Sequence, residues 1–177
     1  MKLDKLFNGL NRIDNGDYIL EGDLIVDENL EIDLDDRLVV RGNIKVKNSI
    51  VANLGVVAVK GIKAGEGIEA GCGIEAGDGI EAGWGIKAVK GIKAGEGIKA
   101  GWGIEAGDGI EAGWGIKAGW GIKAGDGIEA KTYIHSEKRI FAGISVYHTS
   151  ANCNKVIKCA ELRKGEIGHG ELVIVKD

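Results

Sequence analysis

The chain contains no proline, only three cysteines and few aromatic residues, which make up 5% of its 177 residues. The cysteines, Cys72, Cys153 and Cys159, are odd in number and form no C-x-x-C pair, so the sequence indicates neither a disulfide framework nor a zinc site. No apolar run approaches the roughly 18 residues of a membrane-spanning helix, and residues 1–11 lack the pattern of a secretory signal. We therefore expect a cytoplasmic protein with no membrane partner.

Glycine is the residue that the chain has in excess. Its 31 glycines are more than twice what the roughly 7% of an average protein would give. They do not recur at every third position, which excludes a collagen helix. An apolar content of 44% and a net charge of only −4 argue against disorder. The glycines therefore belong to a packed, repeating structure.

That structure has a period of six. From Gly61 to Ala130 the chain repeats Gly-Ile-(Lys/Glu)-Ala-Gly-x, and steps of six in both directions meet only aliphatic residues from Leu20 to Val146. Six is not a helical period, whereas the triplet Ile, Lys or Glu, Ala alternates inward, outward and inward as a short strand does. Glycine suits the intervening corners because it adopts positive φ without a steric penalty. The sequence predicts an all-β fold, a single-stranded parallel β-helix (β-solenoid) with one strand per hexad. Proline would break the hydrogen bonds between its coils.

The number of hexads in a coil follows from which residues would stack. With three hexads per coil, Trp84, Trp102 and Trp120 form one column, and the outward Lys and Glu residues alternate in sign between neighbouring coils. Two hexads pair the charges equally well, and four pair them poorly. The tryptophan column favours three hexads, which is about 18 residues per coil.

The two ends of the chain depart from the repeat and are expected to cap the solenoid against further stacking. Residues 1–17 are predicted to form an N-terminal capping helix, because Leu3, Phe7 and Leu10 fall on one helical face together with Leu6 and Ile13. Residues 18–148 are predicted to form the solenoid. Residues 149–177, which show strand-like alternation, are predicted to form a C-terminal β cap built as a short hairpin.

The hexads resemble those of bactofilin-like, polymer-forming proteins and, more distantly, of hexapeptide-repeat acyltransferases. The transferase repeat places a small residue two positions before the aliphatic one, where this chain has residues such as Glu66, Asp78 and Trp84. The segment Leu38-Val-Val-Arg-Gly-Asn-Ile-Lys-Val is more similar to the bactofilin pattern. That resemblance implies a triangular β-helix and a self-assembling scaffold. Repeats of this kind also resemble those of phage and mobile-element proteins, which implies a bacterial or phage-infected host.

Similarity to the acyltransferases would imply a histidine base near a subunit interface, for which the chain offers His135, His148 and His169. None of them has an evident orienting carboxylate in the sequence, and no long loop interrupts the repeat to bind a substrate. No Gly-Lys-Ser/Thr follows the Gly-x-Gly corners, which are therefore turns and not phosphate loops. We expect no catalytic residue, no cofactor and no metal, and thus no enzyme.

Two features indicate a surface that binds a partner. Trp84, Trp102 and Trp120 should point outward at one edge, with Trp114 on a neighbouring edge, and exposed tryptophans are enriched at interface hot spots. Stacking of the rings within the chain is the alternative explanation. The second feature is a run of ten carboxylates between residues 14 and 36 with no base among them. Its core is the acidic patch of Asp23, Asp27, Glu28, Glu31, Asp33, Asp35 and Asp36.

Such a run either forms a solvated face or mimics nucleic acid toward a basic partner. A negative surface disfavours direct binding of nucleic acid. The sequence thus predicts a rigid protein–protein interaction module, for example an inhibitor or decoy of a basic nucleic-acid-binding protein, and a homo-oligomer such as a dimer. The alternative is a bactofilin-like scaffold, and a hexapeptide-repeat acyltransferase is a more distant one.

Overall fold

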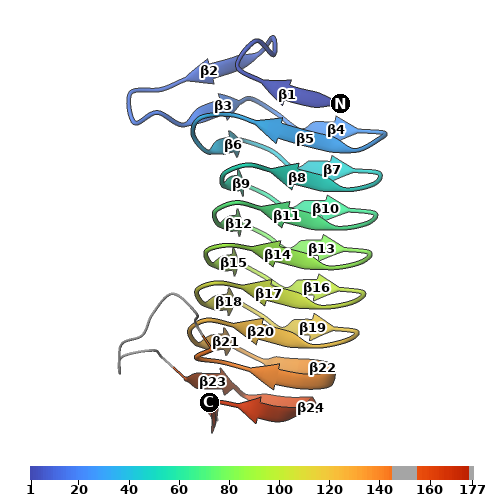
Figure 1. The fold of residues 1–177 in the computed structure, drawn as a ribbon, viewed down its shortest axis with the longest axis vertical. Helices are drawn as coiled ribbons and strands as arrows, with labels where there is room; N and C mark the ends of the chain where they lie inside the picture. The colour runs from blue at the N-terminus through green and yellow to red at the C-terminus, as the bar shows by residue number, and fades with distance from the viewer. Residues whose placement is uncertain (145–154, 176–177) are drawn as a thin grey trace.

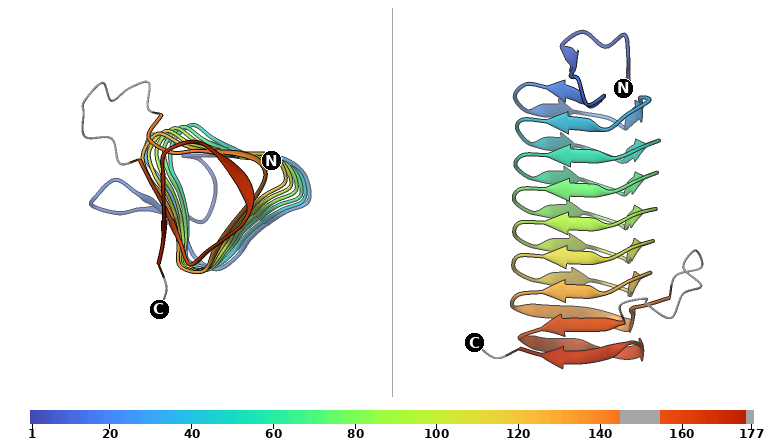
Figure 2. Two further views of the ribbon diagram at one scale, coloured as in Figure 1. Left: turned by 90° about the horizontal axis from the view of Figure 1, so that it is seen from below. Right: turned by 90° about the vertical axis from the view of Figure 1, so that its left-hand side faces the viewer.

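The computed structural model describes residues 1–144 and 155–175, and this part of the chain is built from short β-strands wound into a column (Figure 1). Seen along its axis, the column has a three-sided cross-section (Figure 2). The described residues contain no helix that could span a membrane. The architecture is a parallel β-solenoid, as the sequence predicted.

The strands stack in register on three faces. Face 1 consists of β1 (Lys2–Asp4), β5 (Leu30–Asp33), β8 (Ile50–Ala52), β11 (Ile68–Ala70), β14 (Ile86–Ala88), β17 (Ile104–Ala106) and β20 (Ile122–Ala124). Face 2 consists of β4 (Leu24–Val26), β7 (Ile44–Val46), β10 (Ile62–Ala64), β13 (Ile80–Ala82), β16 (Ile98–Ala100) and β19 (Ile116–Ala118). Face 3 consists of β2 (Leu10–Arg12), β3 (Tyr18–Leu20), β6 (Leu38–Val40), β9 (Val56–Ala58), β12 (Ile74–Ala76), β15 (Ile92–Ala94), β18 (Ile110–Ala112), β21 (Ile128–Ala130), β23 (Val156–Cys159) and β25 (Glu171–Ile174).

Two longer strands near the C-terminal end, β22 (Tyr133–Phe141) and β24 (Glu161–His169), run around the corner between faces 2 and 1. In β22, Ile134 pairs with β19 on face 2 and Ile140 pairs with β20 on face 1. These strands join the two faces into one 15-stranded sheet, while face 3 forms a separate 10-stranded sheet.

The coil of three hexads is confirmed by the pairing. Ile62 pairs with Ile80, and Ile80 pairs with Ile98, so each residue stacks on the one three hexads further along the chain. A coil of two hexads is therefore wrong. The chain makes about eight turns, so at roughly 4.8 Å per turn the column is about 38 Å long.

The core is a narrow bore filled by the first and third residue of each strand, as the alternation predicted. In the regular coils these are isoleucine and alanine, all of them buried, and the residue between them points outward. The bore holds no side chain larger than isoleucine across this region, and backbone hydrogen bonds to the strands above and below fix the spacing of the coils. Such a core leaves little freedom to change volume.

Between β3 and β22 the hexad register shifts once, by two residues, and the sequence pattern does not reveal the shift. Leu30 pairs with Ile50, 20 residues further along the chain, whereas Leu38 pairs with Val56, 18 residues further along. The coil that starts at Leu30 is therefore two residues longer than the coil that starts at Leu38. The insertion lies between Ile32 and Leu38. Because strand side chains alternate with period two, a shift by two leaves every inward position inward and aliphatic. Counting steps of six therefore could not detect the insertion.

The glycines of the Gly-x-Gly corners do not have positive φ, contrary to the expectation from the sequence. Positive φ occurs at six glycines outside the regular repeat, such as Gly22 and Gly143. In the repeat the requirement is close approach of backbones: a Cβ built on Gly83 would lie 1.9 Å from the carbonyl oxygen of Gly65 in the preceding coil. The corner glycines allow neighbouring coils to touch.

The predicted N-terminal helix is wrong, because residues 1–17 extend the sheets instead. Strand β1 pairs in parallel with β5 on face 1, and β2 pairs antiparallel with β3 on face 3. Leu3 is fully buried at the end of the bore, but Leu6, which the helix would have buried, is 92% exposed. A helix would have left the upper edges of β3 and β5 without hydrogen-bond partners, and the two strands satisfy them.

The predicted C-terminal hairpin is also wrong. The segment is β as expected, but β23 pairs in parallel with β21, β24 with β22, and β25 with β23. The solenoid thus continues to Ile174. Val146, His148 and Cys153 lie outside the described residues.

Candidate functional site

Three tryptophans form a row along the corner between faces 2 and 1. Trp84, Trp102 and Trp120 occupy equivalent positions in three successive coils, since the amide of Trp102 donates to the carbonyl of Trp84 and that of Trp120 to Trp102. Their side chains are 56%, 67% and 64% exposed. The column that the sequence predicted is therefore present and faces solvent.

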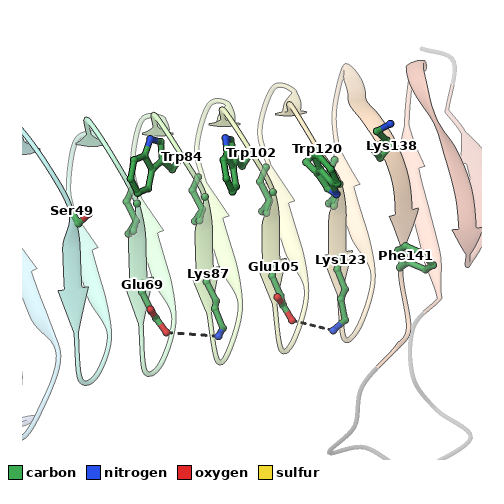
Figure 3. A pocket seen from close by; sticks show the side chains of 18 of the residues that line it. Ser49, Glu69, Trp84, Lys87, Trp102, Glu105, Trp120, Lys123, Lys138 and Phe141 are labelled. Atoms are coloured by element: carbon green, nitrogen blue, oxygen red, sulfur yellow. Dashed lines mark hydrogen bonds and ion pairs between the residues drawn. The ribbon is translucent and has the colours of Figure 1, made fainter.

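A second row, of alternating charge, runs parallel to the tryptophans on face 1 (Figure 3). It consists of Glu69, Lys87, Glu105 and Lys123, the outward residues of β11, β14, β17 and β20. The Lys123 ammonium lies 3.0 Å from Glu105, and that of Lys87 lies 3.8 Å from Glu69. These ion pairs are exposed, so each contributes under about 1 kcal/mol to stability.

Between the two rows the surface is hollow because its floor carries no side chains. The residue between each tryptophan and the following strand is glycine, at Gly85, Gly103 and Gly121. The equivalent position is Ser49 near one end and Arg139 at the other, where the glycine series stops. The result is a groove of about 830 Å³, which we call the tryptophan groove.

The tryptophan rings contact one another only in part. Trp84 and Trp102 are stacked, with ring centroids 6.4 Å apart and planes inclined by 24°. Lys138 continues the row, and its ammonium lies 5.7 Å from the centroid of Trp120, a cation–π contact. Trp84 and Trp102 therefore stack within the chain, while each of the three tryptophans stays more than half exposed.

Trp114 lies on the corner between faces 3 and 2, away from the groove. Its amide and carbonyl bond to Glu96 and Thr132 in the adjacent coils, so no tryptophan stands above or below it. It is 60% exposed. The structure thus separates Trp114 from the other three tryptophans, as the coil of three hexads predicted.

Most carboxylates of the acidic patch form ion pairs or hydrogen bonds with other residues of the chain. Carboxylates of the first coil hold the N-terminal strand in place: Asp33 lies 2.8 Å from Lys2, Asp35 lies 2.7 Å from Lys5, and Glu28 lies 2.9 Å from the N-terminal amine. The sequence analysis missed these partners because it assigned residues 1–17 to a helix. Asp27 and Glu31 are exposed, whereas Asp36 is half-buried and accepts a hydrogen bond from the amide of Arg37.

The same contacts shift the ionisation of the patch. Hydrogen bonds from Lys5 and then from the hydroxyl of Tyr18 lower the pKa of Asp35 to about 2. Hydrogen bonds from the backbone and side chain of Asn43, which stacks above it, lower the pKa of Asp23. Both groups stay ionised at neutral pH, but their charge is directed at neighbours in the fold.

Two of the three histidines, His135 and His169, lie in the part of the chain that the structure describes. His135 does have a carboxylate, since its Nε2 lies 2.9 Å from Glu137, a pairing that the sequence analysis did not find. Glu137 also bonds Lys164 of the next coil, and these contacts, Lys164 first, lower its pKa to about 2. A carboxylate held in this way orders a cluster of surface side chains. His169 is exposed on β24.

The two described cysteines, Cys72 and Cys159, are free thiols. Cys72 is half-buried, and burial of Cys159 raises the pKa of its thiol. Among residues 1–144 and 155–175, no three His, Cys, Asp or Glu side chains converge as metal ligands would.

A scan against protein-family models finds none that matches, and searches of curated proteins and of solved structures find no match either. The function must therefore be argued from the surface itself.

The sequence analysis found the tryptophans of this groove but not the groove. It did not recognise that the glycine before each strand of face 1 leaves a hollow between two rows of side chains. It also missed Lys138 and Phe141, which lie in β22 at the end of the regular repeat. The sequence did contain an indication of the groove: the glycine before each strand of face 1 is replaced by Arg139 where the groove ends.

Proposed function

We propose that the protein is a non-enzymatic protein-binding module and that the tryptophan groove is its contact surface. The observation that supports this is the row of three tryptophans, each more than half exposed, beside a hollow of about 830 Å³. Contiguous exposed aromatic surface of this kind is uncommon on monomeric proteins and is typical of interfaces.

The groove combines the two features that a protein interface needs. Its tryptophans and glycine floor offer apolar area for burial, and the row of Glu69 to Lys123 forms a charged rim that can select a partner. Backbone hydrogen bonds to both neighbouring coils hold the strands beneath the groove, so the surface is rigid before binding. A preformed surface loses little conformational entropy on association.

The absence of catalysis in this proposal is supported by the regularity of the coils. From β6 to β22 every hexad has the same length, so no inserted loop encloses a substrate pocket there. The acidic first coil is not the proposed contact surface, because Lys2, Lys5 and the N-terminal amine already neutralise part of it. Mimicry of nucleic acid would need those carboxylates to be free.

The test is a comparison of two charge substitutions on exposed tryptophans. Trp102→Glu places a charge in the middle of the groove, and Trp114→Glu places one on another corner of similar exposure. We expect Trp102→Glu to abolish self-association and the capture of partner proteins from cell extract, while Trp114→Glu leaves both intact. Circular dichroism should show the same β structure in both. Loss with both variants, or with neither, would refute the groove as the contact surface.

A second candidate is a bactofilin-like scaffold that stacks end to end. It is favoured by the C-terminal end of the column, where Leu172 and Ile174 of β25 are 37% and 42% exposed. Among the described residues no strand covers the outer edge of β24 or β25. Light scattering and negative-stain images separate the candidates: growing fibres a few nanometres wide support the scaffold, and discrete particles support the binding module.

A further inference from the structure

The outward column of face 1 is complementary to itself when its order is reversed. From β5 to β24 the strand register places one outward residue at each of eight levels, which read Glu31, Val51, Glu69, Lys87, Glu105, Lys123, Phe141 and His169. Lys2 of β1 forms a further level beyond Glu31 and has no opposite level when the order of these eight is reversed. Reversal about the midpoint sets Lys87 against Glu105 and Glu69 against Lys123. It also sets the two apolar residues, Val51 and Phe141, against each other. At the outermost level a glutamate meets a histidine, which can donate a hydrogen bond to it.

We propose that the tryptophan groove binds a second copy of this chain, face 1 against face 1, with the two columns antiparallel. The two-fold axis lies in the interface, along the strand direction, between β14 and β17. This inference rests on the proposed function, because it takes the groove as the contact surface and names its occupant. Charge complementarity over the levels from β5 to β24 indicates this occupant.

The tryptophans fit the same axis. A rotation about the strand direction preserves position along the strand, so the tryptophan row of one copy meets the tryptophan row of the other. Trp84 then opposes Trp102 of the second copy, and Trp102 opposes Trp84, which gathers four rings at the axis. Trp120 then lies opposite Glu66 of the second copy, which occupies the position equivalent to Trp84 in the preceding coil. Burial of aromatic rings at the centre of the contact is the arrangement that stabilises interfaces most.

Other pairings of face 1 are worse. If the two columns were parallel, every charge of the row would face its own copy, and like charges directly opposite one another are destabilising. If the antiparallel columns slipped by one level, a charge would face itself at the axis. A slip of two levels would bring Glu105 against Val51, or Lys87 against Phe141. Of these registers, only the central one sets Lys against Glu at the four middle levels and Val51 against Phe141.

The other two faces lack this property. On face 2 the outward column runs from Ile25 to Lys164, and reversal about the midpoint of Glu81 and Lys99 sets Lys63 against Lys117. On face 3, reversal about the midpoint of Lys93 and Glu111 sets Glu75 against Glu129. Only the face that carries the tryptophan groove is self-complementary.

The experiment is a charge exchange between two chains, read as the dissociation constant of the dimer by sedimentation or light scattering. Lys87→Glu and Glu105→Lys each place like charges opposite one another twice in the homodimer. Each should weaken dimerisation roughly tenfold to hundredfold. An equimolar mixture of the two variants has opposite charges at all four central levels and should dimerise as tightly as the wild type.

The matched control is Glu69→Lys, the same kind of substitution at a different level of the same face. A mixture of Glu69→Lys with Lys87→Glu leaves two like-charge contacts and should stay dissociated. Mixing cannot repair a folding defect within one chain, so rescue reports contact between chains, and thermal melts of each variant confirm that it folds.

The inference is overturned if the wild-type chain stays monomeric at about 100 µM, or if a mixture of Lys87→Glu and Glu105→Lys stays dissociated. It is also overturned if Glu69→Lys, and not Glu105→Lys, restores dimerisation of Lys87→Glu. A monomeric wild type whose capture of other proteins is lost with Trp102→Glu would refute the second copy and leave the proposed function standing. A dimer that survives Trp102→Glu would contradict both.

Discussion

Replacing Ile98 with alanine is expected to lower the free energy of unfolding by about 3 to 5 kcal/mol. Ile98 is 1% exposed and stacks in the bore directly between Ile80 and Ile116. Removing three carbons costs about 2.4 kcal/mol in transfer free energy, at about 0.8 kcal/mol for each buried methylene. The cavity that remains adds the rest.

The cavity term should be large here because the site cannot collapse. Strand β16 is hydrogen-bonded to β13 on one side and β19 on the other, and the amide of Ile98 donates to Gly115 at 3.0 Å. These ladders keep the coils at a fixed spacing, so neighbouring isoleucines cannot move far into the void. Ile98→Val, which removes one methylene, should cost about 0.5 to 1.5 kcal/mol.

The assay is equilibrium denaturation in urea, followed by circular dichroism. Lys99→Ala is the control on the same strand: its side chain is exposed and only loses an ion pair of 3.1 Å with Glu81, so it should cost under about 1 kcal/mol. If Ile98→Ala is no more destabilising than Lys99→Ala, the bore does not hold the fold together, and the reasoning fails.

Two further predictions concern the N-terminal end. Arg37 donates two hydrogen bonds, of 2.8 and 3.0 Å, to the buried carboxylate of Asp17 and lowers its pKa. Because the pKa of Asp17 is lower in the folded chain than in the unfolded one, the ionised carboxylate stabilises the fold at pH values above about 4. That contribution is lost as the pH falls through the folded pKa. Asp17→Asn should therefore lower the free energy of unfolding by about 1 to 2 kcal/mol at pH 7, as measured by urea denaturation. The difference in stability between the variant and the wild type should become smaller below about pH 4. A difference that does not change with pH would contradict this reasoning. Deleting residues 1–16 removes β1 and β2 and exposes the edges of β3 and β5. Light scattering should then show end-to-end association of the truncated chains. If the truncated chain has the same oligomeric state as the full chain, β1 and β2 do not act as a cap.

The coil could be predicted because the repeat is redundant. The isoleucines at steps of six, from Ile62 to Ile128, fix the inward positions, and the tryptophan spacing fixes three hexads per coil. Each hexad has the same local preference for a short strand as its neighbours. A fold can be predicted from sequence when local preferences and the global structure agree in this way. The tryptophan row followed from the same spacing.

The ends could not be predicted because their pairing is not local. Residues 1–17 have apolar residues at helical spacing, yet Leu3 is drawn into the bore by pairing with Ile32 of β5, far along the chain. An unpaired sheet edge offers hydrogen bonds that a short isolated helix cannot match. The C-terminal alternation likewise fits a hairpin or a parallel coil, and only the edge of β21 and β22 selects the coil.

The sequence by itself determined the period, the inward residues and the column of tryptophans, since these depend only on spacing along the chain. Tertiary structure decided what the surface offers: the hollow between the tryptophans and the charged row, the ion pairs that neutralise part of the acidic coil, and the order of charges along each face. Those properties depend on which residues stand side by side in neighbouring coils, and residues three hexads apart in sequence become neighbours only when the strands stack.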